Sequence, residues 1–328
     1  MHYLLRRLGL YGLAAWVALT VNFLLPRAMP GDAATAMFGR AQGKMSPEAL
    51  EALREAYGFT NEPLLEQYLT YLSHLLSGDL GVSIARNFEP VTSVLATGLQ
   101  WTLLVAGTAL VISFLIGTLL GILVAWRRGG FLDEVLPGSL IFLGAFPYFW
   151  LAMLFVYVLG FKAGLFPVRH AYSAHLTPEW SVVFVADMMA HAFLPVLSIV
   201  LASLGGWLLG MRNTMIAVLD TASIKLAWAK GLSPWRVVLQ YAARNALLPN
   251  LTGFGMALGF VLGGSLLTEI VFSYPGQGYI LIEAIRAQDY PLMQGVFLVI
   301  TLAVLCANWL VDLVTYWLDP RTRGEASP

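Results

Sequence analysis

The sequence predicts an all-α membrane protein with six transmembrane helices. Of its 328 residues, 58% are hydrophobic and only 12% are charged, whereas a soluble domain carries about 25% charged residues. Six apolar stretches are each long enough to cross a bilayer, which takes about 20 residues. Polar segments separate the first stretch from the second and the fourth from the fifth. The stretches are approximately Leu8–Leu25, Trp101–Trp126, Leu136–Phe161, His191–Met211, Leu251–Phe272 and Leu292–Leu318.

The first apolar stretch lies within residues 1–29, which we interpret as the first transmembrane helix. Arg6 and Arg7 precede the stretch and small residues follow it at positions 33–36, so a cleaved secretory signal is the alternative. The apolar run is longer than the core of a usual signal. This length favours a retained helix.

The distribution of basic residues predicts the orientation of the helices. With a cytoplasmic N-terminus, the short outer loops contain only Lys162, Arg169 and Arg286. Both termini are therefore expected in the cytoplasm. The basic residues on the cytoplasmic side are Arg6, Arg7, Arg127, Arg128, Arg212, Lys225, Lys230, Arg236, Arg244, Arg321 and Arg323. The predicted domains are the first helix at 1–29, an extracytoplasmic segment at 30–98, and a core of five helices at 99–328 with a cytoplasmic loop at 219–250.

The extracytoplasmic segment is expected to contain two helices. Ser46 and Pro47 open the first, which Gly58 closes, and Pro63 begins the second, which runs through Leu76. The second helix has an apolar stripe, so we expect it to pack on the membrane domain or to lie along its surface. A folded cap is the favoured interpretation, and a contact surface for an extracytoplasmic partner is the alternative. The stripe consists of Leu65, Tyr68, Leu69, Leu72, Leu75 and Leu76.

Five residues in or near the apolar stretches are interpreted as structural or gating residues. Pro147 interrupts the third stretch and is expected to kink its helix. Glu269 lies near the outer end of the fifth stretch, just before a break at Pro275 and Gly276, and Asp312 lies in the sixth. A charged side chain at the middle of a bilayer costs about 2.5–3.5 kcal/mol on insertion scales. We therefore expect both carboxylates to face protein or water, with a structural role favoured for Asp312.

The polar segment from Leu219 to Pro249 has the signals of two short helices. Asp220 is placed to cap the first helix, and Gly231 is placed to end it in the left-handed conformation. Lys225 and Lys230 then lie toward the negative end of the helix dipole. A simple connection between transmembrane helices needs none of these signals, so the segment is expected to bind a partner.

The second helix of this segment is expected to begin directly after Gly231. Ser233 is placed as its N-cap and Pro234 as its first residue. Leu232 and Val237 fit the apolar positions that flank such a cap. The segment is therefore expected to form a helix, a tight turn and a second helix.

The sequence shows no motif for catalysis, metal binding or nucleotide binding. Gly39 to Met45 resembles a phosphate-binding loop but has the wrong spacing and no hydroxyl after its lysine. His170 and His175 share a loop, which is a weak metal signal, and the single Cys306 lies in an apolar run. The net charge is zero, which argues against a nucleic-acid partner. We expect a protein that is not an enzyme and binds no metal or cofactor itself.

Several blocks of the chain match one family. The polar segment resembles the cytoplasmic loop of ATP-binding-cassette importer permeases, in which a small-residue helix, a glycine and a helix ending in Leu-Pro follow one another. Here the pattern is Ala227-Trp228-Ala229-Lys230-Gly231 and then Leu248-Pro249. The chain resembles the first of the two permeases in dipeptide, oligopeptide, nickel and related importers. The other matching blocks are Pro30-Gly31-Asp32, Gly78-Asp79-Leu80-Gly81-Val82-Ser83, the run from Glu269 to Gly278, Asp289-Tyr290-Pro291, Asn308-Trp309 with Asp312, and Asp319-Pro320-Arg321.

The resemblance implies the fold of a type I importer permease in a bacterial cytoplasmic membrane. A similar permease pairs with a second, homologous permease and receives its substrate from an extracytoplasmic binding protein. Two cytoplasmic ATPase subunits bind ATP and Mg²⁺, and each receives one coupling helix, here Thr221–Lys230. The residues that the resemblance assigns to coupling are Asp220, Ala222, Lys225, Ala227, Ala229, Lys230 and Gly231.

One departure from the family pattern affects the start of the coupling helix. The family usually places an acidic residue and an aromatic before Arg-Thr-Ala, whereas this chain has an alanine, a serine and a lysine in that region. We interpret Asp220 as the residue that supplies the acid, two positions earlier. This departure affects the expected contacts with the ATPase, but not the expected presence of the loop. The atypical residues are Ala222, Ser223, Lys225, Leu226 and Ala227.

Peptides are the expected substrate, and nickel complexes or oligosaccharides are the alternatives within the same machinery. A secondary transporter would need ion-coupling residues near the middle of the membrane, whereas Glu269 and Asp312 lie toward the ends of their helices. A membrane scaffold without transport is the third hypothesis. All three hypotheses place the chain in a lipid membrane.

Overall fold

The computed structural model describes residues 2–28, 63–83 and 85–318, and this part of the chain is predominantly helical. The predicted helix from Ser46 to Gly58 lies outside the described residues. The chain forms two compact units, each with its own internal contacts. Unit 1 comprises Met1–Trp101 and Pro275–Leu305, and unit 2 comprises Thr102–Tyr274 and Cys306–Pro328.

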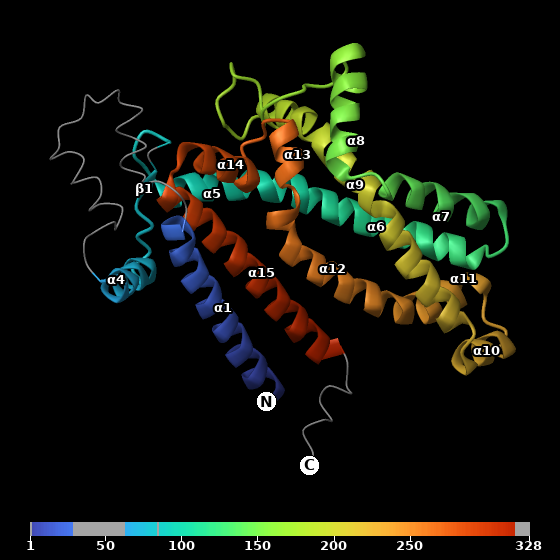
Figure 1. Ribbon diagram of the computed structural model, residues 1–328. Coiled ribbons are helices and arrows are strands. Elements are labelled where there is room, and N and C mark those ends of the chain that lie inside the picture. Colours follow the sequence, from blue (N-terminus) through green and yellow to red (C-terminus); the bar gives the residue numbers. More distant parts are fainter. Residues whose placement is uncertain (1, 29–62, 84, 319–328) are drawn as a thin grey trace. The chain divides into compact units, whose positions relative to one another are not determined.

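Unit 1 combines the first helix with two segments far from it in sequence. Asn22 and Gln294 exchange hydrogen bonds between their side chains and backbone carbonyls, at 2.8 and 3.3 Å, which join α1 and α15 side by side (Figure 1). Helices α5 and α15 continue into unit 2. The elements are α1 (His2–Ala28), α4 (Leu64–Leu76), β1 (Val82–Ser83), β2 (Glu89–Pro90), α5 (Val91–Thr102), α14 (Gln277–Ala287) and α15 (Tyr290–Leu318).

A buried aspartate joins the short hairpin of β1 and β2 to the start of α15. Asp289 accepts hydrogen bonds from the Ser83 hydroxyl at 2.6 Å and from the Ala85 N–H at 2.9 Å. Its other carboxylate oxygen accepts the Leu292 N–H at 3.2 Å and so caps α15. Two of the sequence blocks singled out above, at 78–83 and 289–291, are therefore parts of one structural junction.

Unit 2 is built on the packing of α6 against α9, which lie side by side in Figure 1. A Cβ atom on Gly121 would lie 2.6 Å from the Leu208 carbonyl oxygen, and one on Gly117 would lie 3.1 Å from that of Leu204. These two positions therefore require glycine for the close approach of the helices. The elements of unit 2 are η1 (Leu103–Gly107), α6 (Thr108–Trp126), α7 (Phe131–Gly144), α8 (Tyr148–Phe155), η2 (Val156–Lys162), α9 (Val182–Leu219), α10 (Ala222–Ala229), α11 (Pro234–Arg236), η3 (Val237–Ala243), α12 (Arg244–Gly264) and α13 (Leu266–Val271), where η marks a π-helix.

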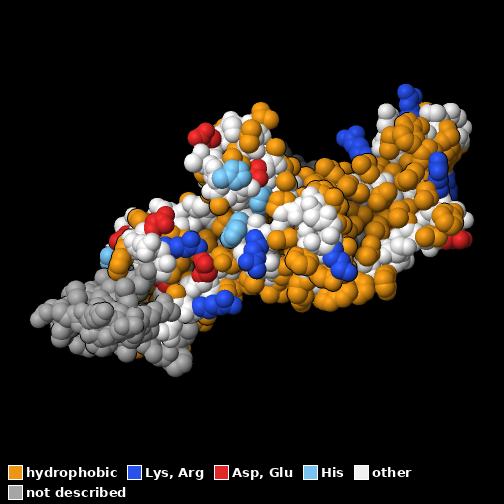
Figure 2. Space-filling view, turned by 90° about the horizontal axis from the view of Figure 1, so that it is seen from above, with side chains coloured by type: hydrophobic (Ala, Val, Ile, Leu, Met, Phe, Trp, Pro, Cys, Tyr) orange, Lys and Arg blue, Asp and Glu red, His pale blue; other side chains and the backbone are white. Residues whose placement is uncertain are grey.

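Several of these helices are long and apolar enough to cross a membrane. Four single helical segments meet this test among the described residues, at Arg7–Leu25, Val91–Trp126, Val182–Leu219 and Tyr290–Leu310. A fifth crossing results if the bent pair at Phe131–Gly144 and Tyr148–Lys162 counts as one span. Figure 2 shows broad areas of hydrophobic side chains on the described surface, as expected of a protein that contacts lipid. The count of six spans stays a prediction. Helices α12 and α13 occupy the part of the chain where the fifth span is predicted.

The predicted kink at Pro147 is a complete break in the helix. Helices α7 and α8 meet at an angle of 89°. Pro147 has an extended backbone conformation, with ψ of 135°, and stands directly before α8 as its N-cap. Pro137, by contrast, lies inside α7. A proline has no N–H to donate to the preceding turn, and at Pro147 the chain uses this property to start a new helix in another direction.

Candidate functional site

The polar segment between α9 and α12 forms the predicted helix, turn and second helix. Gly231 ends α10 with a φ of +74°, in the left-handed region. Its N–H donates to the Trp228 carbonyl at 2.9 Å, and the Leu232 N–H donates to the Ala227 carbonyl at 3.4 Å. These two bonds form a Schellman motif, the usual glycine stop of a helix. The conformational prediction for Gly231 is therefore confirmed.

The predicted cap at Asp220 is wrong. Helix α9 continues to Leu219, and Asp220 has helical torsion angles and closes that helix. Thr221 is the N-cap of α10 but accepts no cap hydrogen bond from α10, and its hydroxyl donates backward to the Val218 carbonyl at 2.7 Å. The sequence expectation placed the cap one residue too early because it did not anticipate the length of α9.

The second helix begins as predicted, although without its side-chain cap. Ser233 occupies the N-cap position and Pro234 the first position of α11. The Ser233 side chain makes no cap hydrogen bond. Leu232 and Val237 lie in one hydrophobic cluster, as the flanking apolar pair was expected to do. The helix then continues through η3 into α12.

One face of α10 is fixed to the ends of the long helices. Ile224 and Ala227 are buried, with 1% and 4% of their surface exposed. Trp235 of α11 packs against Trp126 at the end of α6, with ring centroids 4.9 Å apart. The segment is therefore packed against residues of α6, α9 and α12. The buried residues of this cluster are Ala125, Met211, Met215, Ile224, Ala227, Val237, Val238, Ala242, Ala243 and Ala246.

The opposite face of α10 is exposed and apolar at its centre. Leu226 lies on this face and exposes 56% of its surface. Trp228 stands four residues after Ile224, at the edge of the buried face, and exposes 44%, and Trp235 of α11 exposes 58%. Large exposed apolar side chains occur on surfaces that contact another protein or a membrane. The remaining residues predicted for coupling are also exposed: Asp220, Ala222, Lys225, Ala229, Lys230 and Gly231.

An ion pair that sequence analysis missed joins α7 to α9. The Arg212 Nε atom lies 2.6 Å from a carboxylate oxygen of Asp133. The other carboxylate oxygen accepts the Gly129 N–H at 3.0 Å. The Asp133 side chain is 7% exposed, so the pair is largely shielded from water. An acidic residue in the first turn of a helix was the only sequence signal, and it did not identify the partner.

Glu269 is the buried centre of a hydroxyl cluster in unit 2. Its Oε1 atom accepts hydrogen bonds from Thr102 at 2.8 Å and from Ser265 at 2.7 Å. All three residues are at least 98% buried. The prediction that Glu269 faces protein or water is confirmed, and protein surrounds it. Burial and the charge of Glu269 raise the pKa of the nearby Tyr274 phenol.

The turn after Glu269 also ends in a Schellman motif, although its left-handed residue is a serine. Ser273 has a φ of +48°. Its N–H donates to the Ile270 carbonyl at 3.1 Å, and the Tyr274 N–H donates to the Glu269 carbonyl at 2.8 Å. Pro275 follows, and Gly276 is the N-cap of α14. Asp312 lies elsewhere, half-buried in α15.

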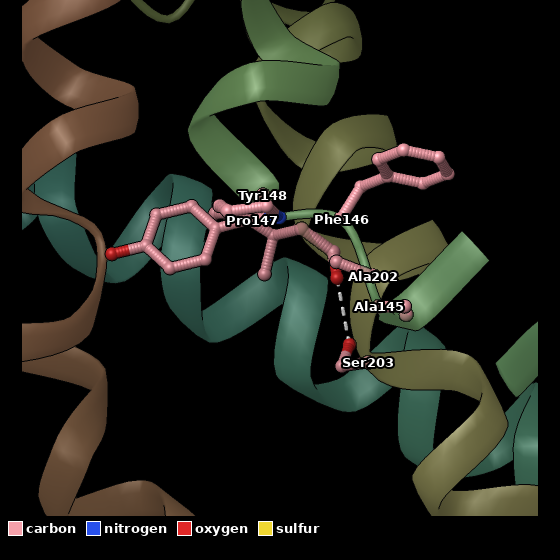
Figure 3. Close-up of a pocket in the computed structure, with 8 residues that line it drawn as sticks. Ala145, Phe146, Pro147, Tyr148, Ala202 and Ser203 are labelled. Atoms are coloured by element: carbon pink, nitrogen blue, oxygen red, sulfur yellow. Dashed lines mark hydrogen bonds between the residues drawn. The ribbon is translucent and has the colours of Figure 1, made fainter. Parts of the chain in front are cut away.

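A pocket of about 330 Å³ lies at the break between α7 and α8. Figure 3 shows the Phe146 and Tyr148 rings pointing in opposite directions from the break. Ser203 is a polar residue of the α9 wall, and its hydroxyl donates to the Ile199 carbonyl at 2.7 Å. No Asp, Glu, Lys, Arg or His side chain lines the pocket. The lining residues are Gly144, Ala145, Phe146, Pro147, Tyr148, Ile199, Ala202 and Ser203.

The described residues offer no obvious metal centre. Among residues 2–28, 63–83 and 85–318, no three His, Cys, Asp or Glu side chains lie close enough together to hold an ion. His170 and His175, the weak sequence signal, are thus not part of such a group. The Asp133–Arg212 pair and the Glu269 cluster have the features of structural polar sites, since each carboxylate is hydrogen-bonded and buried.

Comparison with known proteins agrees with this architecture. The sequence pattern described as "binding-protein-dependent transport system inner membrane component" matches residues 117–324. The chain is 33% identical over 341 residues to the di/tripeptide transport system permease protein DppB of Pseudomonas aeruginosa. It is 32% identical over 324 residues to the dipeptide transport system permease protein DppB of Lactococcus lactis, and 31% identical over 342 residues to that of Escherichia coli K12. Each comparison covers at least 98% of this chain and 99% of the relative. The chain belongs to the family of binding-protein-dependent transport system inner membrane components.

Proposed function

We propose that this chain, as the permease subunit of an ATP-driven, binding-protein-dependent importer, carries di- or oligopeptides. The support is that relatives matched over nearly their whole length are named for dipeptide or di/tripeptide transport. Nickel complexes and oligosaccharides are the alternatives that the same machinery would accommodate.

The proposed assembly contains this permease, a second homologous permease, two cytoplasmic ATPase subunits and an extracytoplasmic binding protein. In the membrane the chain has six spans, with the α7–α8 pair as the third and α12–α13 as the fifth. Both termini and the segment 219–250 face the cytoplasm, because short connections on that side hold most of the Arg and Lys residues.

The segment around α10 is the proposed point of energy transfer. The observation that supports this role is its two-sided construction: one face is buried against α6, α9 and η3, and the other is exposed and apolar. ATP and Mg²⁺ act at the partner ATPases. Closure of the ATPase pair pushes on the exposed face, and the buried face transmits the displacement to the long helices. The ATPases thereby bias the bundle between inward and outward access.

Uptake by the purified importer tests the proposed substrate and energy source. The complex with its binding protein, reconstituted in vesicles, should accumulate a labelled dipeptide only when ATP is present. A nickel complex or an oligosaccharide taken up in preference to dipeptides would overturn the peptide assignment. Uptake driven by an ion gradient without ATP would overturn the importer mechanism.

A tryptophan pair tests the docking face. Trp228→Ser removes a large exposed side chain from α10, and Trp180→Ser removes a fully exposed one from a loop outside the segment. Trp180→Ser should not lose stability, because surface substitutions usually change it by less than about 0.5 kcal/mol. Trp228 is only 44% exposed, so the unfolding midpoint of Trp228→Ser is measured beside the co-purification. Only Trp228→Ser should weaken the co-purification of the ATPase subunits. Equal co-purification by both variants would show that α10 is not the docking face.

A further inference from the structure

Helix α4 of unit 1 has three distinct faces. It contains no buried residue, so it is a surface helix along its whole length. One face contacts α1. A second face is polar and exposed, with Glu66, Thr70 and Ser73. The third face lies between them and consists of leucines.

The first face fixes α4 at one end of the membrane-spanning part of α1. Tyr68 and Tyr71 pack on the Phe23 ring, with centroids 5.1 and 5.5 Å away. The Tyr68 and Thr20 hydroxyls are hydrogen-bonded at 2.8 Å. The side chain of Arg27 donates twice to Gln67, at 3.1 and 2.9 Å. The apolar span of α1 covers residues 7–25, so these contacts lie at its last turns.

The leucine face is exposed although it is apolar. Leu65, Leu69 and Leu76 leave 68%, 57% and 87% of their surface uncovered. They fall within about 40° of one another around the helix axis, since a helix turns once every 3.6 residues. They therefore form one narrow stripe, which the contact with α1 leaves open.

At the end of α1 to which α4 is attached, α1 also exposes apolar side chains. At the same end of α1, Val21, Leu24 and Leu25 are exposed by 54%, 47% and 38%, within a helix that spans the membrane. An amphipathic helix held at this depth places its apolar face among the upper acyl chains and its polar face in water. The three faces of α4 match the three neighbours available there: α1, lipid and water.

We propose that α4 is an interfacial helix whose leucine stripe inserts into the lipid leaflet at this end of α1. The partner is the bilayer itself, at the boundary between headgroups and acyl chains. In this position α4 anchors the hairpin that follows it, and with it the Asp289 junction, at the membrane surface.

Nitroxide scanning of the assembled importer in vesicles tests this proposal. Cys306 is the single cysteine, so a Cys306→Ala protein provides the background. Single labels go on the stripe, as Leu65→Cys and Leu69→Cys, and on the polar face, as Thr70→Cys and Ser73→Cys. Leu13→Cys, on the exposed face of α1, is the lipid reference. Collision rates with oxygen report lipid, and collision rates with a water-soluble nickel chelate report solvent.

The stripe labels should behave like the label at position 13, with oxygen collisions several-fold more frequent than chelate collisions. The polar-face labels should show the reverse ratio. Frequent chelate collisions at position 65 would place the stripe in water and overturn the proposal. Exclusion of both reagents from the stripe, with an immobilised spectrum, would show that protein covers it and would equally overturn the proposal.

Discussion

The helix end at Gly231 and the helix end at Ser273 share one backbone motif but have opposite surroundings. Each ends with a left-handed residue and the same pair of backbone hydrogen bonds. The stop at Gly231 is exposed, and a Cβ atom there would meet nothing within 4 Å. The stop at Ser273 follows the fully buried Glu269 and leads into the buried Tyr274. The motif ends a helix in both places, but the stop at Gly231 is open to solvent and the stop at Ser273, an internal joint, lies beside buried residues.

The largest effect is expected when the internal joint loses its carboxylate. Glu269→Ala removes the acceptor of the Thr102 and Ser265 hydroxyls and leaves a cavity. Unsatisfied buried groups cost about 1–3 kcal/mol each, so the variant should lose about 3 kcal/mol of stability. The thermal unfolding midpoint of the purified protein measures the loss. Glu269→Gln is the matched control: it keeps one oxygen as an acceptor and should lose about 1 kcal/mol.

Equal stability of Glu269→Ala and the wild type would contradict this prediction. It would mean that Thr102 and Ser265 find other acceptors, so that the α13 end does not depend on the carboxylate. The comparison between the two helix ends would then rest on exposure alone.

An intermediate effect on stability is expected at the exposed stop. Gly231→Val forces a β-branched residue into the left-handed region, which costs about 1–2 kcal/mol. The strain should distort the turn between α10 and α11 and weaken the coupling between the ATPases and the permease. ATP hydrolysis should continue, while transport should fall by about tenfold. A loss of about 1.4 kcal/mol in coupling free energy corresponds to that factor. Hydrolysis and uptake measured in the same vesicles give the ratio.

Gly231→Asn is the control for this variant, because asparagine tolerates the left-handed conformation. It should retain most of the coupled transport. If Gly231→Val transported as well as the wild type, the turn at Gly231 would only end a helix and would have no role in coupling. The two helix ends would then not differ in function.

Local signals in the sequence located the helix end at Gly231 and the break near Pro275, because the signals and the structures lie within a few residues of each other. Gly231, Pro234 and Pro147 each act on their own backbone torsion angles, and the structure confirms their effects. Asp220 was misplaced because α9 continues to Leu219, eight residues beyond the apolar stretch that ends at Met211 in the sequence, and Asp220 closes that helix.

The contacts between distant elements could not be predicted. Asp133 and Arg212 are 79 residues apart, and neither sequence position indicates that α7 and α9 meet there. The same holds for Glu269, whose hydroxyl donor Thr102 is 167 residues away. The sequence indicated only that Glu269 faces protein or water, because a charged side chain facing lipid is costly. Only the fold identifies which residue supplies it.

The smallest effect is expected when the internal stop receives the residue of the exposed one. Ser273→Gly removes the Cβ atom from a left-handed position, a relief of about 1–2 kcal/mol. It also gives the unfolded chain more freedom, which offsets about 0.5–1 kcal/mol. The net gain should be about 0.5 kcal/mol, visible as a slightly higher unfolding midpoint with unchanged transport. A loss of transport in this variant would show that the serine side chain itself acts at the joint, and that the two helix ends differ in chemistry as well as in burial.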